Sequence, residues 1–337
     1  MNKQALVICI IAIYITACGT KKNIPDVSGI QIQLDTVRFE KDFFAIDTTH
    51  TEQALDNLQQ KYPAFLNDYL YNLLGLPPNK DSVLPGINRF IHDYKPVYDS
   101  VMLKYPSIQT ATKQLSHALQ FVKYYFPKYK TPPALITFTG PLEGYSNVLT
   151  TSGVAVGLQL YLGKGYVLYN TDYIADRYPP YRTRRFEAGY IAVDCMKNII
   201  LDIYPTNDID QPLINQMIEA GKRLYVLDAC MPETADSLKT GYTQQQLDDC
   251  YNDEARIWNF FLENNLLFVT DQAQTRDYMN DGPKTETMTE KSPGFIGQFV
   301  GWQIVKKWME QDSKRTLPQL LQTPARQIFD EAKYKPK

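Results

Sequence analysis

The fold is decided in the middle of the chain, by the stretch Val154-Ala155-Val156-Gly157-Leu158-Gln159-Leu160-Tyr161. Its β-branched and alternating apolar residues predict one or two strands. A second apolar stretch, residues 134–138, follows Pro132-Pro133 and predicts another strand. Residues 30–39 alternate apolar and polar side chains, as a half-buried strand does. We therefore predict a small mixed sheet of three or four strands.

Helical patterns flank this sheet in the sequence. Before it they cover residues 51–61, 64–76, 87–94, 97–105 and 109–126, and after it residues 186–204, 212–225, 243–263 and 292–310. Thr243 and Gln246 form a capping box, and Ser292-Pro293 resembles a cap followed by proline at the first helical position. Gly297 and Gly301 lie one turn apart, so another helix can approach closely there. The sequence predicts an α+β fold that is mainly helical, with a small sheet and a helical bundle.

The N-terminus has the features of a bacterial lipoprotein signal peptide. Lys3 precedes a short apolar run, residues 5–14, and then Ile15-Thr16-Ala17-Cys18. The run is too short to span a bilayer and ends at a processing site. We predict a signal peptide over 1–17, palmitate-type lipidation at Cys18 and a tether over 18–28. The alternative is an ordinary signal peptide with an accidental cysteine.

Residues 29–337 are predicted to form a single globular domain, as one core or as two lobes that divide near residues 130 and 180. A chain of this length is compatible with either arrangement. No acidic run follows Cys18. We therefore expect a protein anchored by lipid to the inner or outer membrane of the cell envelope, with its domain facing the periplasm.

Composition excludes several classes of function. The chain has 35 basic and 37 acidic residues, so no basic excess favours nucleic acid as a partner. Its three histidines, His50, His92 and His117, lack metal-ligand spacing, so we predict no metal and no cofactor. Cys195 and Cys250 lie among apolar residues, which favours buried free thiols, and the sequence leaves disulfide pairing among Cys195, Cys230 and Cys250 open.

One cluster of residues could carry chemistry. The predicted helix 186–204 follows a run of arginines, which oppose the helix macrodipole and require an acidic partner, a bound anion or solvation. We take Arg184, Arg185 and Tyr190 as candidate binding residues. The weak candidates for catalysis are Glu187, Asp194 and Glu219. The structural alternative is a salt bridge from Asp194 to an arginine, Lys197 or Lys222, and from Glu219 to Lys222 or Arg223.

Several motifs together resemble the gliding-motility lipoprotein GldB family of Bacteroidetes bacteria. They are Arg38-Phe39-Glu40-Lys41-Asp42-Phe43-Phe44, the stretch from Glu219-Ala220-Gly221-Lys222-Arg223 to Asp228, Gly241-Tyr242-Thr243, Ile257-Trp258-Asn259-Phe260-Phe261, Ser292-Pro293-Gly294-Phe295-Ile296-Gly297, Gly301-Trp302-Gln303-Ile304-Val305 and the ending from Ala332 to Lys337. The resemblance covers almost the whole mature chain. It implies a lipid-anchored envelope protein needed for gliding and associated with the motility and secretion apparatus.

A more distant resemblance is to zincin-type metallopeptidase folds, which place a strand before a helix bearing His-Glu-x-x-His. Here the corresponding residues are Tyr190-Ile191-Ala192-Val193-Asp194, so both histidines and the general-base glutamate are absent. We therefore favour a non-catalytic scaffold or binding component; the distant resemblance implies a degenerate zincin-like architecture. The alternative is a hydrolase with a divergent carboxylate site.

Overall fold

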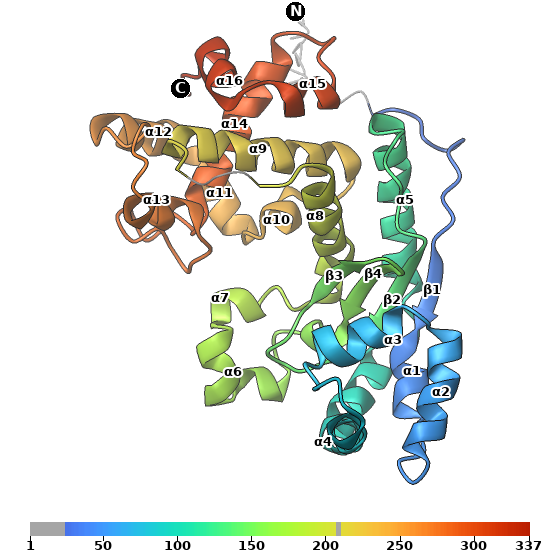
Figure 1. The fold of residues 1–337 in the computed structure, drawn as a ribbon. Coiled ribbons are helices and arrows are strands. Elements are labelled where there is room, and N and C mark those ends of the chain that lie inside the picture. Colours follow the sequence, from blue (N-terminus) through green and yellow to red (C-terminus); the bar gives the residue numbers. More distant parts are fainter. Residues whose placement is uncertain (1–23, 207–209) are drawn as a thin grey trace, which may run out of the picture.

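A small sheet lies between two groups of helices (Figure 1). The computed structural model describes residues 24–206 and 210–337. Within these residues the sheet has four strands, β1 (Asp35–Arg38), β2 (Ala134–Phe138), β3 (Asn147–Thr150) and β4 (Gly153–Gly157), in the order β1-β2-β4-β3. Strands β1, β2 and β4 run parallel, and β3 pairs antiparallel with β4. The predicted small mixed sheet is confirmed.

The sheet separates two hydrophobic cores. Successive side chains of a strand point to opposite faces. In β2, Ile136 and Phe138 join a core formed with residues 39–91, whereas Leu135 joins a larger core that residues 97–122 form with the helices after the sheet. In β4, Ala155 faces the first core and Val154 the second. All of β2 and β4 is buried, and this explains why these strands are apolar except for Thr137.

The helices before the sheet are α1 (Phe39–Phe44), α2 (Thr51–Lys61), α3 (Phe65–Asn67) with a π-helical turn (Asp68–Leu73), α4 (Lys80–Lys104) and α5 (Gln109–Tyr125). Two predictions were wrong here. Residues 30–34 are not strand, because β2 begins only at Ala134 and gives them no partner. The predicted helices 87–94 and 97–105 form one helix, α4, which contains Pro85 and Pro96. Each proline removes a backbone hydrogen bond, and burial of residues such as Ile87 and Val101 offsets that cost.

The elements after the sheet are mainly helical, as predicted. They are the 3-10 turns Leu158–Leu160, Val167–Asn170 and Ala188–Tyr190, and α6 (Asp172–Arg177), α7 (Pro180–Thr183), α8 (Ile191–Ile203), α9 (Leu213–Cys230), α10 (Asp236–Thr240), α11 (Gln244–Asn252), α12 (Glu254–Glu263), α13 (Gln272–Met279), α14 (Ile296–Glu310), α15 (Leu317–Gln322) and α16 (Ala325–Ala332). The α+β, mainly helical fold class is confirmed.

Several helix boundaries differ from the prediction. Helix α8 begins at Ile191, because Glu187 has an extended backbone and a 3-10 turn follows it. Helix α14 begins at Ile296, because Phe295 adopts a left-handed conformation with φ 61° that an α-helix cannot include. The predicted helix 243–263 is divided at Asp253 into α11 and α12. The Thr243–Gln246 capping box is confirmed.

Helices α9 and α14 cross where both present glycine. A β-carbon on Gly221 would overlap the Gly301 carbonyl, and one on Gly301 would overlap the Met217 carbonyl oxygen. The predicted close approach at Gly301 is therefore confirmed, and its partner is α9. Cys195, Cys230 and Cys250 are buried free thiols. In the described part of the chain, no helix is both long and apolar enough to cross a bilayer.

Candidate functional site

The segment between α7 and α8 carries the candidate arginines. Arg184 donates a hydrogen bond of 2.7 Å to the Gly241 carbonyl and one of 3.3 Å to Gln246 Oε1. Gly241 has φ +76°, which glycine adopts without strain. Burial lowers the pKa of Arg184, and the neighbouring Arg185 acts in the same direction. Arg184 therefore joins the segment before α8 to the turn between α10 and α11.

Two other arginines share one carboxylate. Arg185 forms an ion pair with Asp281, and Arg182 Nε lies 3.4 Å from the same Asp281 Oδ2. Asp281 follows α13, about a hundred residues further along the chain. Its side chain is 16% exposed, whereas Arg182 is 42% exposed. One partly buried carboxylate thus faces two guanidinium groups, of which Arg182 is the more exposed.

Asp194 lies in the first turn of α8, beside these arginines. It accepts a hydrogen bond of 3.1 Å from the Tyr161 hydroxyl, and its Oδ1 lies 3.7 Å from Lys197 Nζ. The predicted pairing of Asp194 with a lysine is confirmed. Burial lowers the pKa of Lys197; Asp194 opposes this shift, and Arg185 adds to it. Solvent still reaches 37% of the Lys197 side chain, so this lysine lies in a concave surface.

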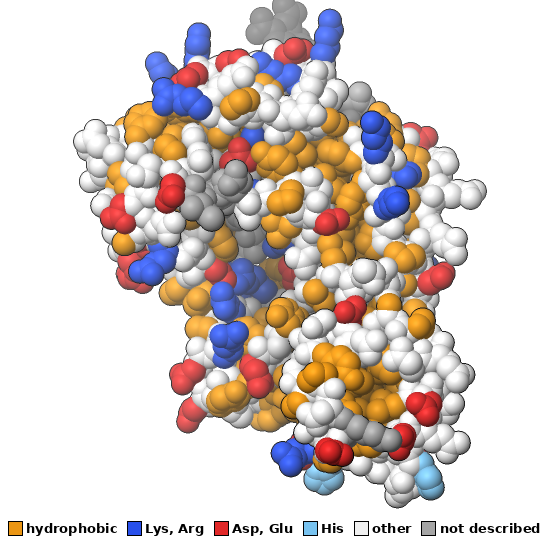
Figure 2. Space-filling view, in the orientation of Figure 1, with side chains coloured by type: hydrophobic (Ala, Val, Ile, Leu, Met, Phe, Trp, Pro, Cys, Tyr) orange, Lys and Arg blue, Asp and Glu red, His pale blue; other side chains and the backbone are white. Residues whose placement is uncertain are grey.

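Tyr190 completes the group. Burial raises the pKa of its phenol, against the charges of Arg184 and Arg185. We call the set the basic cleft; it comprises Arg182, Arg184, Arg185, Tyr190, Asp194, Lys197 and Asp281. With four cations and two carboxylates, its formal charge is +2. Figure 2 shows Lys and Arg side chains gathered in a hollow on this face of the molecule.

A small pocket adjoins the basic cleft at Lys197. It has a volume of about 250 Å³ and is lined by Lys197, Ile200, Leu201, Ala220, Arg223, Leu224, Leu227, Lys239, Phe295 and Gln298. The lining combines three cations with an apolar floor from α8 and α9 and contains no carboxylate. Phe295, which precedes α14 in a left-handed conformation, contributes one wall. Strained backbone beside a pocket is a recurrent feature of binding sites.

The structure does not bring the three candidate carboxylates together. Glu187 accepts a hydrogen bond of 2.9 Å from the Lys164 backbone amide, next to Gly163, and so fixes that loop. Glu219 accepts bonds of 2.7 Å from the Tyr204 hydroxyl and from Lys222 Nζ. Only Asp194 belongs to the basic cleft. Among the described residues, no three His, Cys, Asp or Glu side chains are grouped as metal ligands.

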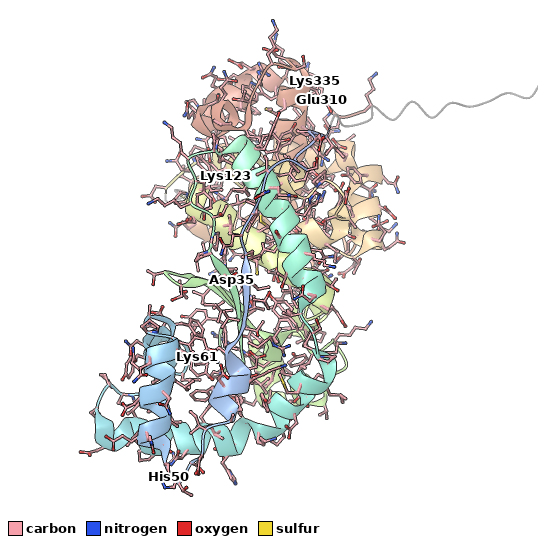
Figure 3. All side chains as sticks on the ribbon, turned by 90° about the vertical axis from the view of Figure 1, so that its right-hand side faces the viewer. Asp35, His50, Lys61, Lys123, Glu310 and Lys335 are labelled. Carbon is pink, nitrogen blue, oxygen red and sulfur yellow. The ribbon has the colours of Figure 1, made fainter. Side chains whose placement is uncertain are left out.

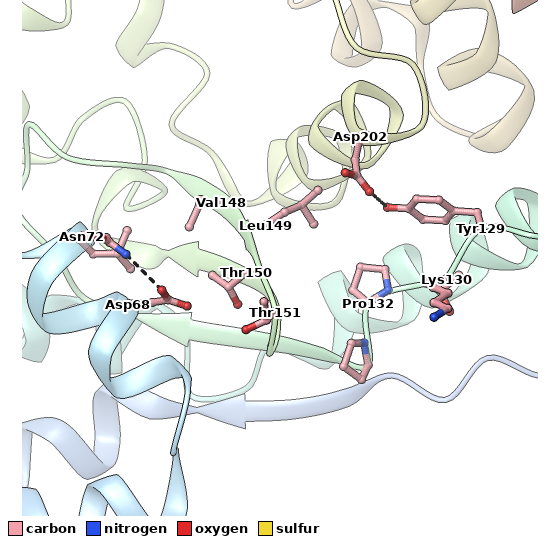
Figure 4. A pocket seen from close by; sticks show the side chains of 13 residues that line it. Asp68, Asn72, Tyr129, Lys130, Pro132, Val148, Leu149, Thr150, Thr151 and Asp202 are labelled. Atoms are coloured by element: carbon pink, nitrogen blue, oxygen red, sulfur yellow. Dashed lines mark hydrogen bonds between the residues drawn. The ribbon is translucent and has the colours of Figure 1, made fainter.

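A second concavity lies at the open edge of the sheet, beside β3 (Figure 4). It has a volume of about 750 Å³ and contains none of the predicted site residues. On one wall Asn72 donates to Asp68 at 3.2 Å, and on another Tyr129 donates to Asp202 at 2.8 Å. Its polar groups pair with one another along the walls, so the basic cleft is the stronger candidate.

Comparison with known proteins identifies the family. The model of the gliding motility protein GldB family, whose label marks it as a lipoprotein family, matches residues 20–336. This chain belongs to the GldB family. No curated protein and no solved structure matches it. The distant resemblance to zincins therefore stays a prediction.

The GldB motifs have structural roles that their sequence does not reveal. In the first motif, Phe39 and Phe43 pack around Tyr69 in the core before the sheet. Glu40 is buried, pairs with Arg38 and accepts a bond of 2.7 Å from Thr137 of β2. The motifs that contain Gly221 and Gly301 pack against each other. Sequence analysis missed Asp281, Lys239 and Phe295 as parts of the cleft and pocket, because only the fold places them beside α8 and α9.

Proposed function

We propose that this GldB family member is a lipid-anchored protein of the cell envelope in a Bacteroidetes bacterium, with its domain facing the periplasm. It supports gliding motility and the associated secretion apparatus as a non-catalytic scaffold or binding component. The family match supports the link to gliding. Anchoring is supported by the sequence Ile15-Thr16-Ala17-Cys18 after an apolar run; these residues lie outside the part that the structure describes.

The contacts of the candidate carboxylates support a non-catalytic role. A general acid or base must reach the proton that it transfers, and its pKa must suit that transfer. Glu187 is occupied by the loop at Lys164, and Glu219 by Tyr204 and Lys222. The bonds of Glu187 to Lys164 and of Glu219 to Tyr204 each join two segments of the fold, and the bond to Lys222 holds Glu219 within α9. The carboxylates therefore act as structural anchors.

The basic cleft is the single observation that carries the binding role. Its charge is +2, and Arg182 and Lys197 are both accessible to solvent. The adjoining pocket adds an apolar floor beside Lys197. An acidic segment of a partner protein, with an apolar side chain next to a carboxylate, matches both features. We propose that such a segment of a gliding or secretion component binds there.

Affinity capture from the native envelope tests this proposal. The tagged wild-type protein is compared with Arg182→Gln/Lys197→Gln, which removes the two accessible cations. The matched control, Lys41→Gln/Lys95→Gln, removes two exposed lysines, one in α1 and one in α4. We expect the first variant alone to lose an envelope partner and to impair gliding. Equal capture and equal gliding by both variants would show that the cleft is not the binding site.

A further inference from the structure

We propose that the end of the molecule from which the N-terminal segment departs is a membrane-facing surface that binds anionic phospholipid headgroups. We call it the tether-end surface; its residues are Lys123, Tyr124, Lys128, Lys314, Lys333, Lys335 and Lys337. The inference rests on the lipid anchoring in the proposed function. It adds an orientation, because the protein surface itself would contact the bilayer.

The path of the N-terminal segment defines this end. Near the sheet, the Thr36 hydroxyl lies 3.2 Å from the Thr112 hydroxyl of α5. Further from the sheet, Gln120 of α5 donates a bond of 2.7 Å to the Ile30 carbonyl. The segment therefore runs antiparallel to α5. Its first described residues lie toward the C-terminal end of that helix, where Lys123 and Tyr124 are exposed.

The short spacing from the predicted lipid limits how far this end can lie from the bilayer. Cys18 and Ile24 are six residues apart. A fully extended chain spans at most about 3.6 Å per residue, so the connection reaches about 22 Å at most. The electrostatic screening length at physiological salt is about 8 Å. Charges at the tether end are therefore held within a few screening lengths of the headgroups. The tether is short enough for these side chains to contact the headgroups directly.

The same end of the molecule is rich in lysine. Residues 120–142, which include the C-terminal end of α5 and the loop after it, contain three lysines and no acidic residue. Residues 314–337 contain six basic and two acidic side chains, and Arg315 and Arg326 pair with the two acids, Glu331 and Asp330. Lys123, Lys128, Lys333, Lys335 and Lys337 are exposed. Figure 3 shows Lys335 and Glu310 at one end of the molecule, with Lys123 on the same side of the sheet.

The opposite end has the opposite charge. Residues 35–100, which form β1 and α1 to most of α4, contain six basic and ten acidic side chains. His50 and Lys61 mark this end in Figure 3, across the sheet from the tether end. Residues 35–100 and 314–337 therefore carry net charges of opposite sign. An anionic bilayer attracts the lysines at one end and repels the other, so both effects favour one orientation.

An aromatic side chain reinforces this interpretation. Tyr124 is 50% exposed beside Lys123, in the last turn of α5. Tyrosine is favoured at membrane–water interfaces, because its ring is apolar and its hydroxyl is hydrated. A surface that binds an acidic protein can lie anywhere on the molecule, whereas a surface that binds lipid must lie beside the anchor. Proximity to the anchor, the sign of the charge and the aromatic residue together point to lipid.

Lysine footprinting of the mature acylated protein in vesicles tests the inference. The protein is purified from its envelope and inserted into vesicles of phosphatidylcholine alone or with phosphatidylglycerol. An amine-modifying reagent and mass spectrometry then report the rate of modification at each lysine. With phosphatidylglycerol at about 0.1 M salt, we expect several-fold slower modification at Lys123, Lys128, Lys335 and Lys337. Protection should disappear at about 1 M salt, where the screening length is about 3 Å.

Variants distinguish surface charge from the mere nearness of the bilayer. In Lys128→Gln/Lys335→Gln/Lys337→Gln we expect protection of Lys123 to be lost. The control Lys41→Gln/Lys61→Gln/Lys95→Gln, altered at the far end, should keep that protection. Equal modification at both ends of an acylated protein would overturn the inference and leave the proposed anchoring intact. Protection in the native envelope but not in anionic vesicles would assign the surface to a partner protein and also overturn it. A purified protein whose mass includes no acyl chain would overturn the anchoring, and the inference with it.

Discussion

Gly221 of α9 and Gly301 of α14 face each other where the two helices cross, with no room for a side chain on either. A β-carbon on either glycine would meet backbone atoms of the facing helix, which cannot move aside as a flexible side chain can. The two residues lie in separate GldB motifs, eighty positions apart. Their contact explains why each motif contains glycine, since only glycine permits this approach.

The first prediction concerns this contact. Gly301→Ala places a methyl group against the Met217 carbonyl, so α9 and α14 must separate. We expect the free energy of unfolding to fall by ~1–3 kcal/mol or more, as overpacked cores do. Thermal unfolding followed by circular dichroism measures the change.

Two other glycines serve as comparisons for Gly301. Gly165→Ala meets no atom within 4 Å and should leave the melting temperature nearly unchanged. At Gly297, the nearest obstacle to a β-carbon is the Met279 sulfur, at the end of a flexible side chain. Gly297→Ala should therefore be milder than Gly301→Ala, although Gly297→Leu should still destabilise the protein. A melting temperature in Gly301→Ala equal to that of Gly165→Ala would show that the helices adjust freely.

The second prediction concerns a buried ion pair. Lys239 of α10 pairs with Asp228 of α9, and both side chains are almost fully buried. Lys239→Met removes the Lys239 ammonium group from the buried Asp228 carboxylate, at an expected cost of ~3–5 kcal/mol. The double variant Asp228→Leu/Lys239→Met should recover much of that loss. Chemical denaturation of the single and double variants tests this, and additive losses would contradict it.

The third prediction concerns Asp194. The apolar residues around it in the sequence indicated a buried side chain, but the structure leaves it partly exposed. Its side chain is 26% exposed and contacts Tyr161 and Lys197. Asp194→Ala should therefore cost ~1–3 kcal/mol, the range for hydrogen bonds to charged groups. Asp194→Asn should be milder, since an amide oxygen still accepts from Tyr161. If Asp194→Asn folded normally but abolished a metal-dependent hydrolytic activity, the hydrolase alternative would replace the scaffold.

The fourth prediction is a loss of stability in alkali. Burial raises the pKa of Tyr125 to about 12, and it raises the pKa of Tyr161 and Tyr242 well above the usual value near 10. A raised pKa means that the unfolded state releases its proton first as the pH rises. The stability that these phenols contribute is therefore complete below about pH 10 and declines above it. Melting temperatures measured from pH 8 upward should fall beyond pH 10, and the buried phenols should ionise only with unfolding.

The fifth prediction concerns lipidation. Cys18→Ala removes the sulfur that would carry the acyl chain, so labelled palmitate should not be incorporated and the signal peptide should stay uncleaved. Metabolic labelling and the mass of the purified protein test this. Cys195→Ala is the control, since that thiol is buried and should not affect labelling. Equal labelling of Cys18→Ala and the wild type would refute lipidation at this residue.

The elements that the sequence predicted well are those with a strong local pattern. Residues 134–138 are apolar except for Thr137 and form β2, and Thr243 and Gln246 cap α11 through bonds between neighbouring residues. Residues 30–34 show that an alternating pattern predicts burial better than it predicts secondary structure. Ile30, Ile32 and Leu34 do pack against the core, as their alternation indicates. They are not strand, because a strand needs a partner, and β2 begins too late to provide one.

The candidate site was recognised only in part. Arg184, Arg185, Tyr190 and Asp194 are close in sequence and do lie in one cleft. Glu219 does not, because α9 orients it toward Tyr204 and Lys222. Asp281, which neutralises Arg185, lies almost a hundred residues away in a loop with no distinctive pattern. Spacing along a helix predicts which residues share a face, but it does not predict what that face contacts.

The sequence by itself determined the mainly helical fold class, the central apolar strands, the family and the glycine face of α14. Each depends on local periodicity, on composition or on motifs in a fixed order. Only the tertiary structure decided which helix meets Gly301, which cations share the cleft and that the lysines of α5 and of the C-terminal end lie on the same side of the sheet as the departing tether. These are contacts between segments far apart in the chain. They depend on how the helices of the two cores pack against the sheet. The hydrophobic effect favours burial of any apolar face, but it does not specify which other face packs against it.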